Sequence, residues 1–89
     1  MDSIYDNMSP EIAEELQQTA KVIYETREHR RVVLARAGAA DEATLLARIA
    51  DGTLGEHPAY ERYLAARILD DTCEAARAAL AARLKEVNR

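Results

Sequence analysis

Apolar and polar residues along this chain form three stretches with a helical period, and glycines separate them. The longest, residues 58–87, contains no glycine and no proline after Pro58 and is rich in alanine, the best helix former. Its thirty residues predict a helix of roughly 45 Å at about 1.5 Å per residue. An 89-residue monomer cannot easily cover such a helix on all sides. We therefore expect this helix to determine the architecture.

The apolar side chains of this long helix fall on more than one face. In its first three turns, one side carries the apolar residues Tyr60, Tyr63, Leu64 and Ile68. A second stripe, with spacings of three and four residues, lies on nearly the opposite side and consists of Leu69, Cys73, Ala76, Leu80, Leu84 and Val87. Small residues such as Ala75 and Ala79 border this stripe and would let another helix approach closely. We predict that the second stripe and these two alanines contact a partner, in part a second copy of the chain.

The first helix is predicted over residues 10–37. Ser9 is a good N-cap, Pro10 suits the first helical position, and Gly38 suits the left-handed position after the last turn. Steps of three and four residues give an inward face of Ile12, Leu16, Thr19, Ile23, Thr26, Arg30, Val33 and Ala37. The ends of this face are apolar, but its middle contains Thr26 and Arg30.

A short helix is predicted between the two long ones, over residues 42–51. Asp41 is its expected N-cap, Gly52 ends it, and its apolar face is formed by Leu45, Leu46 and Ile49. Residues 1–8 have turn formers and no helical period, and they predict a frayed arm ahead of one helical domain, residues 9–89.

The connection between the long helices is too short to return the chain to the far end of the first one. The two helices should therefore run antiparallel, with Arg30 level with Ala65 and Leu16 level with Ala79. The predicted fold is all-α: an antiparallel hairpin with a short helix between its arms, assembling into a dimeric helical bundle.

Composition narrows the classes of function. The chain has no Phe and no Trp, so its core is small, and small helical domains often gain burial by forming oligomers. A net charge of −4 argues against nonspecific nucleic-acid binding. One cysteine excludes an internal disulfide and fits a reducing compartment, and no stretch resembles a signal peptide or a membrane span. We expect a cytoplasmic protein, and ten arginines against two lysines suggest a bacterial coding sequence.

Arg30 is the main departure from an apolar seam, since a buried guanidinium needs a carboxylate. Glu61, Asp70 and Asp71 are candidates on the long helix. The plainer interpretation is a salt bridge that fixes the register of the helices. The functional interpretation is a ligand site for an anion or a partner carboxylate, formed by Arg27, Arg30 and Arg31 with Glu61 or Glu28 as its acid.

Other candidate chemistry is sparse. His29, His57 and Cys73 are the good nitrogen and sulfur ligands, but their spacing matches no metal motif, so neither a metal nor another cofactor is predicted. Cys73 lies in an apolar stripe, where a thiol is usually inert, and no catalytic residues are predicted. Tyr60 and Tyr63 suit either the edge of a core or a binding surface.

Three hypotheses follow, and the sequence resembles no family that we recognise. The first is a homodimeric interaction or regulatory module that binds a protein partner. The second is a small helical enzyme or anion-binding protein using the arginine cluster in the manner of all-helical mutases. A nucleic-acid accessory protein ranks last, and a membrane partner is not expected.

Overall fold

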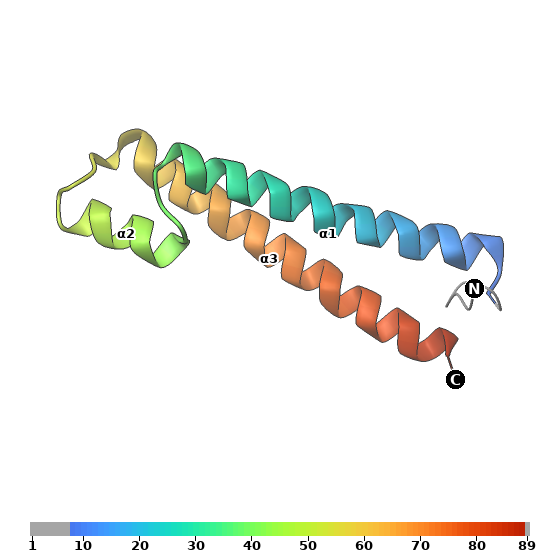
Figure 1. Cartoon of the computed structure of the whole chain (residues 1–89). Helices are drawn as coiled ribbons and strands as arrows, with labels where there is room; N and C mark the ends of the chain where they lie inside the picture. Colours follow the sequence, from blue (N-terminus) through green and yellow to red (C-terminus); the bar gives the residue numbers. More distant parts are fainter. Residues whose placement is uncertain (1–7, 89) are drawn as a thin grey trace.

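The computed structural model describes residues 8–88, and over that range the chain forms three helices. Helix α1 spans Pro10–Arg36, α2 spans Glu42–Ala50 and α3 spans Glu56–Val87. The all-helical class predicted from the sequence is confirmed. Figure 1 shows α1 and α3 running antiparallel, with α2 at the end where the chain turns.

The ends of α1 follow from its capping residues. The Ser9 hydroxyl accepts a hydrogen bond from the Ile12 amide at 3.2 Å, as an N-cap should. At the other end Gly38 adopts a positive φ of 69°, and the amide of Ala39 donates to the Leu34 carbonyl at 3.0 Å. This left-handed turn stops the helix at Arg36, one residue before the predicted end. The predicted arm, residues 1–8, lies outside the described residues except for Met8.

Helix α2 begins and ends by the same chemistry. The Asp41 carboxylate accepts a hydrogen bond from the Thr44 amide at 2.7 Å, and this contact lowers the pKa of Asp41. Gly52 has a φ of 81° and follows the C-cap Asp51, so the helix ends at Ala50 rather than at residue 51.

The start of α3 differs from the prediction that placed Pro58 at the first helical position. Gly55 is the N-cap, and Glu56 and His57 precede the proline within the assigned helix. His57 itself is non-helical, with φ −108° and ψ 130°, because a residue before proline is sterically held out of the α region. Regular helix therefore continues from Pro58, but the chain enters it through a kinked turn.

Full burial occurs mainly where all three helices meet. Leu34 of α1, Leu45 of α2, and Ala59 and Ala66 of α3 form one core cluster. The partly buried residues around this cluster are Val33, Ala37, Ala39, Ile49, Leu54 and Tyr63. Along the two-helix part of the hairpin, the described side chains that reach full burial are Leu16 and Cys73. The core is therefore thick at the turn and thin toward the termini.

Polar contacts at both ends of the hairpin show how α1 and α3 are aligned. Near the turn, Arg62 donates to the Arg36 carbonyl at 3.2 Å. Near the termini, Arg83 Nε lies 2.6 Å from Glu15 Oε2. The register predicted from the sequence agrees with these contacts to within about one helical turn.

The hairpin is elongated. Its dimensions are 55 × 20 × 18 Å and its radius of gyration is 17.5 Å, whereas a compact domain of this length would have a radius of about 12 Å. Its accessible surface is 6320 Å², against about 5,200 Å² for a compact protein of the same mass. None of the described helices combines the length and the apolar character needed to cross a membrane.

Two adjacent leucines of α2 test this packing. Leu45 is 0% exposed and Leu46 is 40% exposed. Leu45→Ala should lower the free energy of unfolding by about 2–4 kcal/mol because it leaves a cavity in the core. Leu46→Ala should cost less than about 1 kcal/mol. Urea unfolding at one fixed protein concentration measures both, and equal losses would contradict the observed orientation of α2.

Candidate functional site

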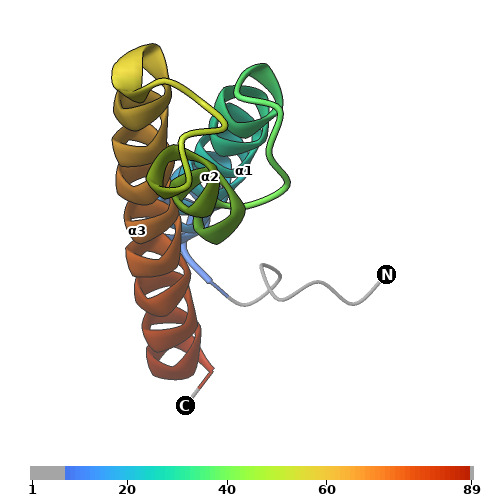
Figure 2. The same ribbon diagram turned by 90° about the vertical axis from the view of Figure 1, so that its left-hand side faces the viewer.

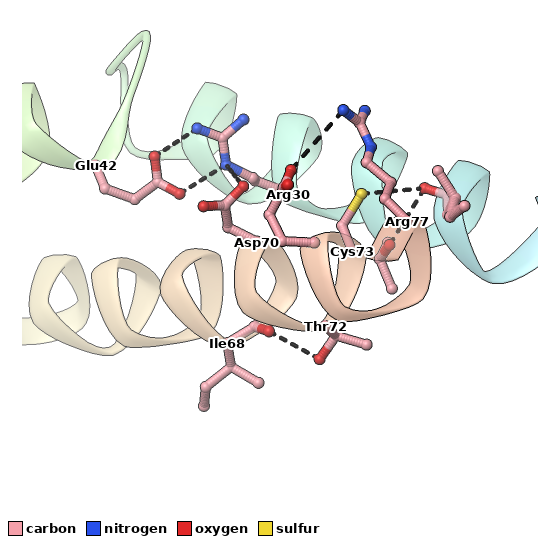
Figure 3. A network of polar contacts seen from close by, with 10 residues as sticks. Arg30, Glu42, Ile68, Asp70, Thr72, Cys73 and Arg77 are labelled. Atoms are coloured by element: carbon pink, nitrogen blue, oxygen red, sulfur yellow. Dashed lines mark hydrogen bonds and ion pairs between the residues drawn. The ribbon is translucent and has the colours of Figure 1, made fainter. Parts of the chain in front are cut away.

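Within residues 8–88, Arg30 and Glu42 form the shortest bidentate pair of a guanidinium and a carboxylate. Arg30 Nε lies 2.6 Å from Glu42 Oε2, and Arg30 Nη2 lies 2.5 Å from Glu42 Oε1. The guanidinium and carboxylate therefore meet through two parallel hydrogen bonds, the strongest geometry available to this pair. Figure 3 shows Arg30 reaching from α1 to Glu42, at the first turn of α2.

A second carboxylate brings α3 into the same contact. Asp70 Oδ1 lies 3.8 Å from Arg30 Nε, so the guanidinium faces acids from both other helices. The hydrogen bonds from Arg30 hold the pKa of Glu42 below its ordinary value, although burial opposes this shift. The hydrogen bond to Glu42, and then the negative charges of Glu42 and Asp70, raise the pKa of Arg30. The three residues form an ionic junction, which we call the Arg30 junction.

The other polar residue in the middle of the α1 face satisfies itself locally. The Thr26 hydroxyl donates to the Val22 carbonyl at 2.8 Å and lies 3.2 Å from the Ile23 carbonyl. It thus needs no partner on α3. The same Ile23 carbonyl also accepts a weak hydrogen bond from Cys73 Sγ at 3.7 Å.

Three of the four residues predicted to form an anion site are paired with side chains other than one another. Arg30 is engaged in its junction, while Arg31 binds Glu28 of its own helix at 3.1 Å. Glu61 contacts His57 in the first turns of α3, and Arg27 is exposed. No cavity is found among residues 8–88. An anion approaching Arg30 would have to compete with Glu42 and Asp70 for the guanidinium.

Sequence reasoning found one of the two acids at the junction. Asp70 is among the three predicted partners of Arg30, whereas Glu42 is not, because the prediction pairs Arg30 with the facing long helix alone. The signal was present: Glu42 directly follows the N-cap Asp41, and α2 begins only six residues after α1 ends. A short link folds the first turn of α2 back beside the last turns of α1, where Arg30 lies.

The candidate metal ligands are dispersed. His29 is exposed on α1, His57 contacts Glu61, and Cys73 is buried between the long helices as a free thiol. In the part of the chain that the structure describes, no group of three or more His, Cys, Asp or Glu side chains is arranged to hold a metal.

The residues predicted to contact a partner on α3 lie on two sides of that helix. Cys73 is 3% exposed, and its thiol donates a weak hydrogen bond to the Ile23 carbonyl of α1. The other residues of its stripe lie on the same side of α3: Leu69, Ala76, Leu80, Leu84 and Val87. These five residues are half-buried. Ala75 and Ala79 are exposed. One face of α3 is therefore used within the chain and the other is open.

One of the two tyrosines at the start of α3 packs within the chain, and the other lies on the open face. Tyr63 packs against the core cluster, and Tyr60 is 44% exposed. Their rings stack with centroids 6.0 Å apart. Tyr60 is thus the first residue of the open face, and its ring stacks on the ring of Tyr63.

The Arg30 junction predicts a difference between two glutamates. Glu42→Gln should lower the free energy of unfolding by about 1–3 kcal/mol, because it leaves a half-buried guanidinium with weaker acceptors. Glu28→Gln, in the exposed pair with Arg31, is the matched control and should cost less than about 0.5 kcal/mol. Urea unfolding at pH 7 measures both. A loss for Glu42→Gln no larger than for the control would show that the junction contributes nothing.

The pH dependence of this difference follows from the lowered pKa of Glu42. Because the folded pKa lies below the unfolded one, the stabilisation is complete above the unfolded value of about 4.3. It is lost as the pH falls through the lower folded value. The stability gap between the parent and Glu42→Gln should therefore close as the pH is lowered below about 4.3. The pKa values of Asp41 and Asp51 are also lowered, but both residues are present in both proteins. Their contributions to the pH dependence therefore cancel in the difference. A gap independent of pH would contradict the assignment.

A scan against protein-family models, a search of curated proteins and a search of solved structures each gave no match to this chain. A function for it therefore has to be argued from the geometry of its own helices.

Proposed function

We propose that this protein is a small helical interaction module that forms a homodimer and binds a protein partner through its helical surface. The observation behind the proposal is the excess surface of the single chain. At 6320 Å², it exposes about 1,100 Å² more than a compact protein of its mass. A standard protein interface buries about 800 Å² on each partner. The excess is thus of the size that one interface would cover.

The small core supports the same conclusion. In the described part of the chain, six hydrophobic residues are buried, and three of them are alanine or cysteine. A core of this size offsets little of the conformational entropy that folding removes. Association with a second helical surface would supply the missing burial.

The exposed apolar side chains are concentrated on helices. Tyr60, Leu64 and Ile68 of α3 are 44, 43 and 65% exposed, and Tyr24 of α1 is 64% exposed. Single exposed apolar residues are ordinary, but aligned ones form a patch that favours protein contact. The first three lie at spacings of four residues on one helix, and so they are aligned.

The proposal predicts the mass of the protein in solution. Light scattering coupled to size exclusion, over a hundredfold range of concentration, should give about twice the chain mass of 9.9 kDa. The dimer should be kept at the lowest concentrations if its affinity is submicromolar. A mass of one chain throughout the range would contradict self-association. Affinity capture would then have to yield a different protein for the interaction module to stand.

A further inference from the structure

The open face of α3 has a graded pattern. Its exposed residues are large in the first half, Tyr60, Leu64 and Ile68, and small in the second half, Ala75, Ala79 and Ala82. At 100° per residue all six lie on the side opposite Cys73, which faces α1. Figure 2 shows α1 and α2 on the same side of α3. The opposite side of α3, which carries these six residues, is therefore uncovered.

We propose that the open face of α3 is the homodimer interface, and that it pairs with the same face of a second copy in antiparallel orientation. This inference rests on the proposed self-association and specifies its geometry. With a twofold axis between residues 71 and 72, Ile68 faces Ala75 of the second copy and Leu64 faces Ala79. Tyr60 is level with residue 83 of the second copy, and the residue of the open face next to that position is Ala82. Every large side chain then meets a small one. A parallel pair would set large against large and leave the alanines apart.

The flanking charges favour the same orientation independently. Arg67 and Glu74 are exposed, seven residues apart, and border the open face on one flank. In an antiparallel pair with this axis, Arg67 lies beside Glu74 of the second copy, and Glu74 beside its Arg67. A parallel pair would set the flank of Arg67 and Glu74 against the other flank of the second copy and would form neither of these contacts. The steric pattern and the charges thus select one twofold arrangement.

One charged residue lies within the face. Asp71 is exposed and is the residue nearest the proposed axis, so the two Asp71 carboxylates approach each other. Arg67 lies four residues earlier on the same helix, where opposite charges are neighbours, and it offsets part of the charge of Asp71. Asp71 therefore limits the affinity of the dimer and also marks the position of its axis.

Disulfide trapping tests the register directly. In the Cys73→Ser background, which keeps a hydrogen-bond donor toward Ile23, Asp71→Cys should form a covalent dimer under mild oxidation. Ala82→Cys, on the same face, should not, because its two copies would lie about 30 Å apart. Efficient trapping of Ala82→Cys alone would indicate a parallel pair and overturn the proposal.

Failure of the register and failure of self-association give different results. If light scattering shows a dimer but Asp71→Cys is not trapped, self-association stands and the α3 face is wrong. If the parent is a monomer at every concentration, both are overturned.

Two exposed apolar residues give a matched test of the face. Ile68 is 65% exposed and lies on it, whereas Tyr24 is 64% exposed and lies on α1. Ile68→Glu places a charge on each copy at the interface and should raise the dimer dissociation constant at least about tenfold, whereas Tyr24→Glu should leave it unchanged. Circular dichroism should show equal helicity for both. Equal dissociation constants for the two variants would overturn the proposal.

Charge reversal tests the orientation of the pair. Arg67→Glu and Glu74→Arg should each weaken the dimer, because each sets like charges across the interface. The double variant restores opposite charges in an antiparallel pair and should recover most of the affinity in sedimentation equilibrium. A double variant weaker than both single variants would contradict the antiparallel register.

Discussion

A hairpin of two long helices has only one seam, and this constraint governs the whole molecule. Each helix can bury one stripe against its neighbour, so the rest of its circumference stays in water. Only where α2 adds a third wall do side chains from three elements interlock, around Leu34, Leu45, Ala59 and Ala66. Toward the termini, Leu16 and Cys73 mark the seam, and the helices diverge in Figure 1. The thin core and the large exposed surface have the same cause.

The Arg30 junction lies at the boundary between the thick and the thin part of the molecule. A guanidinium there can reach the first turn of α2 and also α3, while its half-exposed position limits the cost of desolvation. A hydrophobic residue at this position could pack in the seam but could not hold the N-terminus of α2. The arginine therefore ties the first turn of α2 to α1, beside the core that Leu45 forms with α1 and α3.

Local chemistry accounts for what could be read from the sequence. Caps such as Ser9 and Asp41 and the left-handed glycines Gly38 and Gly52 act within a few residues, so they placed the helix ends to within one or two positions. The length of the connection determined the antiparallel arrangement. Glu42 was missed because its contact with Arg30 depends on how the chain turns a corner. Periodicity separated the two faces of α3, but it could not indicate which face the chain covers by itself.

The two halves of α3 differ in the helices that cover them and in the size of their exposed side chains. Its first half is covered by α1 and α2 on one side and exposes large side chains on the other, whereas its second half has α1 alone and exposes alanines. An antiparallel second copy would bring its own large-residue half over the alanine half of the first. The two-helix part of each hairpin would then be covered by a third helix, as the turn is covered by α2. The alanines in that half thus leave space for a neighbouring helix. The exposed Ile68 and Leu64 are the side chains that would fill this space.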